Sequence, residues 1–148
     1  MEAYYEKEEY DEDGKLMACT NYNSMHKMKN MTRYEYNESG LKSKETYFDE
    51  EGHLVYEYTY FYNSDGRLEK CVKESNEASS ITYTENYEYD AKGNLIKKTT
   101  YDEYGNMNGY PTEYKYDKYG NKTGSYKTDS SGRIIEYDKY GRKIKTYR

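Results

Sequence analysis

Few side chains of this 148-residue chain are suited to catalysis. The two histidines, His26 and His53, each lie in or beside a predicted turn. A histidine that acts as a general base needs a nucleophile within hydrogen-bonding reach, and no local catalytic motif surrounds either one. We therefore expect exposed turn histidines, no catalytic residues, and a protein that is not an enzyme.

Cysteine and carboxylate chemistry is limited in the same way. Cys19 and Cys71 lie at the same position of a repeat, which in a plain meander places them about 19 Å apart across four strand spacings. This exceeds disulfide reach unless the sheet coils, and no short Cys–Cys spacing indicates zinc. Calcium loops gather several oxygen ligands, whereas each turn here offers one or two, with residues 10–14 the densest. We expect structural thiols, no metal and no cofactor.

Tyrosine dominates the composition. The chain has 24 tyrosines and two phenylalanines, with 34% charged residues and a mean hydropathy of −1.42. Such a charge content is typical of disorder, but tyrosine has high β-propensity and a large ring to bury. We expect a folded chain in which any core is made largely of tyrosine rings.

A repeat positions these tyrosines. Its pattern is an aromatic residue, Asp or Asn, two variable residues and Gly, as in YDEDGKL at 10–16 and YDAKGNL at 89–95. Two double-length gaps contain degenerate copies with His26 and Ser79 in the glycine position. Asp or Asn suits the start of a type I turn, and glycine then adopts the left-handed conformation that closes a β-hairpin. The turn glycines are Gly14, Gly40, Gly52, Gly66, Gly93, Gly105, Gly120, Gly132 and Gly141.

Eleven such turns predict an all-β fold. The expected architecture is an antiparallel meander of about twelve strands of about 8–10 residues each, forming a single β-repeat domain over 1–148. The long and short units alternate, and the long units carry the aromatic strands. Because no helix-period segment can cover the sheet, we expect it to curl on itself, to close like a barrel, or to stay open.

Period-two spacing puts most tyrosines on one face of the sheet. Leu54 is expected to share this face with the tyrosines of its strand, and Glu57 and Thr59 to lie opposite. The face is either core or a stacking platform for sugars, bases or a partner protein. The candidate binding face comprises Tyr56, Tyr58, Tyr60, Tyr83, Tyr87, Tyr114 and Tyr116.

The units YDAKGNL at 89–95, YDKYGNK at 116–122 and YDKYGRK at 137–143 resemble the tyrosine–aspartate (YD) repeats of Rhs and wall-associated proteins. The resemblance is clearest over 83–148. It implies a continuous β-sheet of hairpins, which in that family often forms a shell around a toxin domain. About a dozen strands are too few to enclose a domain, so the resemblance implies the meander and not the shell function.

Charge is unevenly distributed. Residues 1–74 carry 10 basic and 17 acidic side chains, whereas the whole chain has a net charge of −5. Residues 114–148 hold ten Lys or Arg, four acids and seven tyrosines, a mixture that can track single-stranded nucleic acid but that solvated strand faces also explain. The N-terminus shows no secretory pattern and no segment could span a membrane, so we expect a cytoplasmic protein.

These features favour a non-enzymatic binding or inhibitory protein of bacterial or phage origin. It would act by stoichiometric contact with another protein, such as a toxin, nuclease or defence effector, in the manner of an immunity or anti-defence factor, because acidic surfaces often meet basic targets. One alternative is a module that binds a small ligand, carbohydrate or nucleotide; another is a structural fragment of a larger YD-repeat protein. Nucleic acid is a less favoured partner.

Overall fold

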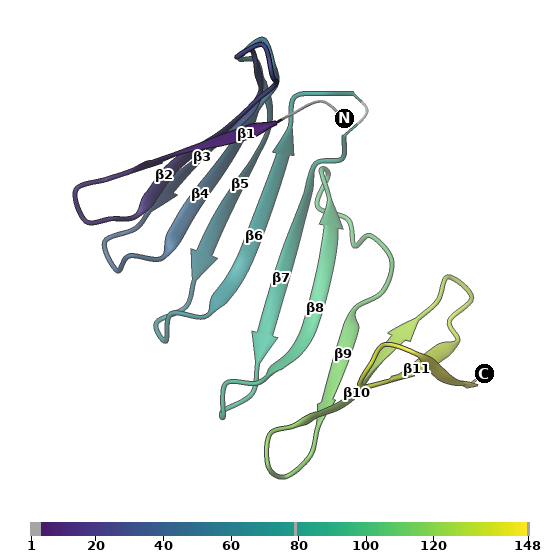
Figure 1. Cartoon of the computed structure of the whole chain (residues 1–148). Coiled ribbons are helices and arrows are strands. Elements are labelled where there is room, and N and C mark those ends of the chain that lie inside the picture. Colours follow the sequence, from purple (N-terminus) through teal and green to yellow (C-terminus); the bar gives the residue numbers. More distant parts are fainter. Residues whose placement is uncertain (1–3, 79, 148) are drawn as a thin grey trace. The chain divides into compact units, whose positions relative to one another are not determined.

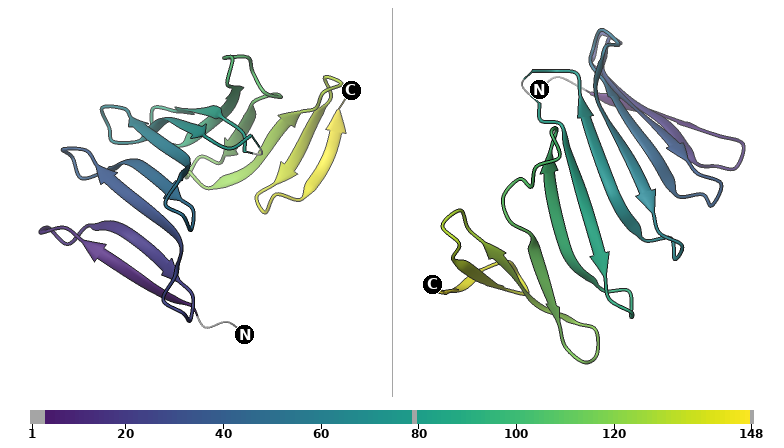
Figure 2. Two further views of the ribbon diagram at one scale, coloured as in Figure 1. Left: turned by 90° about the horizontal axis from the view of Figure 1, so that it is seen from above. Right: turned by 180° about the vertical axis from the view of Figure 1, so that it is seen from behind.

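The computed structural model describes residues 4–78 and 80–147. It confirms the predicted all-β meander: twelve strands follow one another in the sheet in chain order (Figures 1 and 2). Neighbouring strands pair antiparallel. The strands are β1 (Tyr5–Tyr10), β2 (Leu16–Tyr22), β3 (Met28–Tyr36), β4 (Lys42–Phe48), β5 (Leu54–Tyr62), β6 (Leu68–Ser75), β7 (Tyr83–Tyr89), β8 (Leu95–Asp102), β9 (Thr112–Tyr116), β10 (Lys122–Thr128), β11 (Ile134–Asp138) and β12 (Lys143–Tyr147).

The sheet is not closed into a barrel. Strands β1 and β12 stand at the two ends of the strand order, so each has one neighbour among the described strands. The chain divides into two compact units, which are described separately below. Unit 1 contains the residues up to 67 together with 71–82, and unit 2 contains 68–70 together with the residues from 83 onward.

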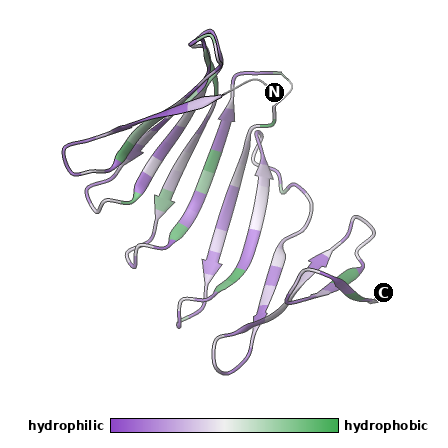
Figure 3. Cartoon of the chain, in the orientation of Figure 1, coloured by the Kyte–Doolittle hydropathy of each residue, from purple (hydrophilic) through white to green (hydrophobic). Residues whose placement is uncertain are grey.

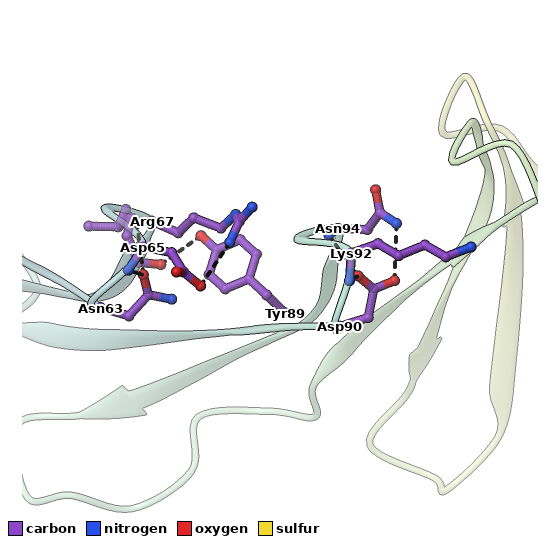
Figure 4. Close-up of polar contacts among 8 residues, drawn as sticks. Asn63, Asp65, Arg67, Tyr89, Asp90, Lys92 and Asn94 are labelled. Atoms are coloured by element: carbon purple, nitrogen blue, oxygen red, sulfur yellow. Dashed lines mark hydrogen bonds and ion pairs between the residues drawn. The ribbon is translucent and has the colours of Figure 1, made fainter.

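In the ten repeats with glycine or His26 in the turn, the Asp or Asn caps its turn. In the turn after β5, the Asn63 side-chain oxygen accepts the backbone N–H groups of Asp65 and Arg67, both at 3.0 Å. Asp90 accepts the N–H groups of Lys92 and Asn94 in the same way, each at 2.9 Å (Figure 4). These bonds satisfy turn amides that the β-ladder leaves unpaired.

The glycine position of the turn is left-handed. The nine glycines of the repeat have φ between +75° and +87°. His26 takes the same conformation with φ of 59°, as its place in the degenerate copy implies. The other degenerate position, Ser79, lies outside the described residues. Because the turn occupies five residues, the strands have 5 to 9 residues and are shorter than the expected length.

Many of the hairpins carry a β-bulge soon after the turn. On β5, Val55 has no register partner, because Phe48 pairs with Leu54 and Tyr47 pairs with Tyr56. Neighbouring residues of β4 point to opposite faces, so Leu54 and Tyr56 do as well. The prediction that Leu54 shares the face of the β5 tyrosines is therefore wrong, because the bulge interrupts the period of two.

The buried residues are small. Within each unit, the described strands contact only their neighbours in the sheet, and no described tyrosine is fully buried. Figure 3 shows hydrophobic residues scattered along the strands instead of gathered in one layer. Half-buried tyrosine rings therefore supply much of the packed surface, in place of a closed core. The buried residues are Ala18, Thr20, Thr46, Cys71, Thr99 and Gly124.

Four tyrosine hydroxyls tie successive hairpins together. The tyrosine that directly precedes a turn Asp or Asn donates to the carbonyl oxygen of the first residue of the preceding strand. We call these bonds the tyrosine latches. They join Tyr36 to Leu16 at 2.8 Å, Tyr62 to Lys42 at 2.6 Å, Tyr89 to Leu68 at 2.6 Å, and Tyr116 to Leu95 at 2.7 Å.

Candidate functional site

The aromatic side chains of β4 and β5 form an ordered array in unit 1. The rings of Tyr47 and Tyr56 stack at 4.8 Å with 5° between their planes. Tyr58 meets Tyr56 edge-on at 5.6 Å and stacks on Tyr60 at 6.2 Å. These rings lie on one face because Tyr47 pairs with Tyr56 and the β5 tyrosines alternate from there. Their stacking holds the rings in one arrangement.

Two lysine ammonium groups lie over the rings of this array. The Lys73 ammonium lies 4.9 Å from the Tyr56 ring centre, and the Lys42 ammonium lies 5.1 Å from that of Tyr60. Lys42 also forms an ion pair of 2.7 Å with Glu45. Burial, followed by the nearby Glu45 carboxylate, raises the pKa of Tyr60 far above its ordinary value. The face therefore combines aromatic rings with both signs of charge.

The other four residues of the candidate binding face lie in unit 2 and are half-buried. The Tyr87 hydroxyl donates to Glu85 at 2.5 Å, and Glu85 is ion-paired with Lys98 at 2.8 Å. The Lys122 ammonium lies 4.9 Å from the ring centre of Tyr114. The seven predicted tyrosines thus form two groups: Tyr56, Tyr58 and Tyr60 in unit 1, and Tyr83, Tyr87, Tyr114 and Tyr116 in unit 2.

The histidines lie in turns. His26 shares a 2.9 Å hydrogen bond between its Nδ1 and the Tyr5 hydroxyl. The ligand atoms of Asp49, Glu51 and His53 lie within 4.8 Å of one another. Turn capping accounts for their closeness, because Asp49 accepts the backbone N–H groups of both other residues. The two bonds lower the pKa of Asp49, and the bond from the His53 N–H has the larger effect.

The two cysteines are reduced thiols on β2 and β6, which are four places apart in the strand order. Cys71 is buried, and burial, followed by a hydrogen bond to Glu6, raises the pKa of the Cys19 thiol. A raised pKa reduces the thiolate fraction and with it the reactivity of the sulfur.

A second group of aromatic residues on unit 2 was not anticipated from the sequence. Glu113 pairs with Tyr126 across the strands, so both face away from Tyr114. Tyr126 and Tyr147 line a pocket of about 450 Å³ with Pro111 and Ile134. Beside it, Glu136 accepts bonds from Lys115 at 2.8 Å and from the Tyr147 hydroxyl at 2.7 Å. The sequence signal available for this group was the period of two along β10, which puts Tyr126 and its immediate neighbours on opposite faces of the sheet.

A third feature is a polar pocket of about 520 Å³ on the same face as Tyr114. Among its lining residues are Lys98, Thr112 and Lys127, which form one row across β8, β9 and β10. The sequence signal that could have located this pocket is the Asn108–Gly109 pair close to Pro111, which interrupts the repeat.

These features define a tyrosine-rich, antiparallel hairpin-repeat sheet. No family model matches the chain, and no curated protein matches it. In solved structures, it is similar to a chain of a Photorhabdus luminescens Tc holotoxin pore, with 14% identity, 95% of this chain and 9% of that chain covered, and a TM-score of 0.45. A TcdB2–TccC3 crystal structure matches with 14% identity, 97% and 10% coverage, and a TM-score of 0.46.

A Bacteroides fragilis protein of unknown function also matches, with 14% identity, 98% of this chain and 91% of that chain covered, and a TM-score of 0.26. The chain spans about a tenth of the length of the two toxin chains. At this level of similarity, membership of the YD-repeat family stays a prediction. The described residues contain no helix long and apolar enough to cross a membrane.

Proposed function

We propose that this chain is a non-enzymatic binding protein that makes a stoichiometric contact with another protein through the tyrosine array of unit 1. We define this array as Tyr47, Tyr56, Tyr58 and Tyr60. The observation that supports the proposal is that these rings stack on one another and are half-buried, while the described strands of unit 1 contact only their neighbours in the sheet. Tyrosine is enriched at protein interfaces because its ring buries area and its hydroxyl tolerates water.

The array is suited to a protein partner for two reasons. The stacked rings and the lysines above them hold one arrangement, so little side-chain entropy is lost on binding. Glu45 and Lys42 provide both signs of charge within the same surface, which favours a partner with a polar rim around an apolar centre. A toxin, nuclease or defence effector with a basic surface fits the excess of acids in the N-terminal half.

Site-specific crosslinking in the native host tests this proposal. A photo-reactive amino acid replaces Tyr58 in one variant and Thr59 in a matched control, because these neighbours point to opposite faces of β5. We expect a discrete protein adduct from position 58 and none from position 59. The proposal is wrong if neither position gives an adduct, or if both give the same one.

The purified partner then permits a quantitative test. Tyr58→Ala should weaken binding by about 30-fold, the size of an interface hot spot of about 2 kcal/mol. Thr59→Ala should change the affinity by less than about threefold. Equal affinities of the two variants would contradict a contact through the array.

A further inference from the structure

The β-ladder is interrupted between β8 and β9. These strands share two register pairs, Lys97 with Glu113 and Lys98 with Thr112. The turn at residues 102–106 is regular, but after it the chain leaves the repeat and reaches β9 through a longer connection, visible between β8 and β9 in Figures 1 and 2. Gly109 in this connection has φ of +76°, although it does not occupy the glycine position of the repeat. A local departure from an otherwise consistent repeat is where functional sites are expected.

The connection is held against β8. The Asn108 backbone N–H donates to the carbonyl oxygen of Thr100 at 2.8 Å, and Met107 bridges to Tyr101. The single proline, Pro111, has no N–H to donate to a ladder and precedes β9. The chain therefore frames a recess between the two strands instead of pairing with β8 without interruption.

The polar pocket occupies this recess. Register and alternation place its strand residues on one face of unit 2, since Lys98, Thr112 and Lys127 form one cross-strand row. The volume of about 520 Å³ lies within the range of small-molecule sites, roughly 300–1,000 Å³. The lining residues are Lys98, Thr100, Asn108, Gly109, Tyr110, Thr112, Tyr114, Ser125, Lys127 and Thr128.

Hydrogen-bond donors and positive charge prevail in the pocket. No carboxylate is among its lining residues. Lys98 is already ion-paired with Glu85 at 2.8 Å, whereas Lys127 is exposed and has no ion pair within the described part of the chain. Thr100, Thr112 and Ser125 add hydroxyl groups. Lys98 and Lys127 are two strand spacings apart, about 10 Å between their backbones, so their long side chains can approach one anion from both sides.

Two aromatic rings lie beside these donors. Tyr110 is 48% exposed and comes from the connection, and Tyr114 comes from β9. Rings of this kind stack on the faces of sugars and bases, at about 1–3 kcal/mol for a base. We propose that this pocket binds a small ligand in which a phosphate or sulfate ester is attached to a sugar or nucleoside ring. The anion contacts Lys127 and the hydroxyl groups, and the ring stacks on tyrosine.

Titrations of the full chain followed by amide NMR test the proposal. The probes are a sugar 6-phosphate, the matching 6-sulfate, a nucleoside monophosphate, the unesterified sugar and nucleoside, and inorganic phosphate. We expect at least one ester to saturate with a Kd below about 1 mM, shifting the amides of Asn108, Gly109 and Thr112. The unesterified compound and inorganic phosphate should each bind at least about tenfold more weakly. The phosphate and sulfate arms identify the ester that is preferred.

Two lysine variants locate the anion. Lys127→Gln should weaken the ester by about tenfold or more, because a charge-assisted hydrogen bond is lost. The matched control is Lys97→Gln, which removes the same charge from β8 on the opposite face, next to Lys98, and should leave the affinity unchanged. Thr112→Val, which removes a hydroxyl at nearly constant volume, should weaken the ester severalfold.

Three results would overturn the proposal. They are the absence of saturation by every ester at 10 mM, equal affinities of the Lys127 and Lys97 variants, and inorganic phosphate binding as tightly as the esters. An unchanged amide spectrum away from the pocket shows that each variant is folded. Because the pocket is separate from the tyrosine array of unit 1, its failure leaves the proposed protein contact standing.

Discussion

Removing the tyrosine latches tests how a sheet with few buried residues is held together. Tyr→Phe substitution deletes one hydroxyl and keeps the ring, so the change isolates the bond to the backbone carbonyl. Burial raises the pKa of Tyr62 and of Tyr116, which indicates that these hydroxyls have lost part of their hydration. The carbonyl oxygen left behind has limited access to replacement water.

The expected loss follows from the net value of such bonds. A neutral hydrogen bond contributes about 1 kcal/mol, so a pair of latches contributes about 2 kcal/mol when the two share no partners. With a urea dependence of about 2 kcal/mol per molar, each pair of substitutions lowers the unfolding midpoint by about 1 M. This is a large fraction of a total stability of about 5–15 kcal/mol.

The two units allow two independent measurements. Tyr36 and Tyr62 report on unit 1, and Tyr89 and Tyr116 report on unit 2. Urea titrations followed by far-ultraviolet circular dichroism give the midpoints of both double Tyr→Phe variants.

The matched control is the double variant of Tyr119 and Tyr140, which are 77% and 71% exposed. It should shift the midpoint by less than about 0.3 M, the equivalent of about 0.5 kcal/mol. The reasoning is refuted if either latch pair shifts the midpoint no further than this control.

Other substitutions separate further contributions to stability. Gly124→Ala should cost up to about 3 kcal/mol, because the new Cβ would lie 2.5 Å from the Tyr137 carbonyl oxygen. Gly52→Ala would place its Cβ in open space but at φ of +82°, and it should cost about 1–2 kcal/mol. A lower urea midpoint for the Gly52 variant than for the Gly124 variant would contradict both explanations. Hydrogen bonds from backbone N–H groups of the same turn lower the pKa of three turn aspartates, Asp90, Asp117 and Asp138. The stability that these carboxylates add is therefore complete above their unfolded pKa of about 3.9, and it is lost as the pH falls through their folded pKa values. Replacing all three with Asn should flatten the fall in stability below about pH 4, and an unchanged acid limb would show that other carboxylates dominate. In native protein, Cys19 and Cys71 should both react slowly with a thiol reagent at pH 7.5 and faster in urea, and rapid native reaction of Cys71 would contradict its burial.

The meander could be predicted from the sequence because each turn is specified within five residues. Asp or Asn followed three residues later by glycine is a local signal, and the left-handed φ at His26 shows that it operates even where the glycine is replaced. The bulges were not predictable in this way. Val55 is left without a partner by pairing with β4, and neither Val55 nor its neighbours in sequence mark the bulge.

The latches and the pocket depend on residues distant in sequence. Tyr62 was recognised as the aromatic residue before a turn, but its hydroxyl partner is 20 residues away, at Lys42. The row of Lys98, Thr112 and Lys127 exists only because three strands align. What the sequence did contain was the irregularity itself, an Asn–Gly pair and a proline that follow the regular turn at Gly105, where the repeat predicts strand residues.

The same irregularity indicates how a repeat sheet acquires function. In the regular hairpins, the turn caps and the four latch tyrosines bind the backbone, so we expect their substitution to weaken the sheet. Within each unit, the described strands contact only their sheet neighbours, so they offer no closed core in which to bury a cavity. We therefore expect a polar small-ligand site where the ladder is broken and a connection closes one side of a recess. Between β8 and β9, Asn108 holds the connection against Thr100 and the strand row supplies the donors. Sites in related hairpin sheets are therefore best sought at the units whose length and turn residues depart from the repeat.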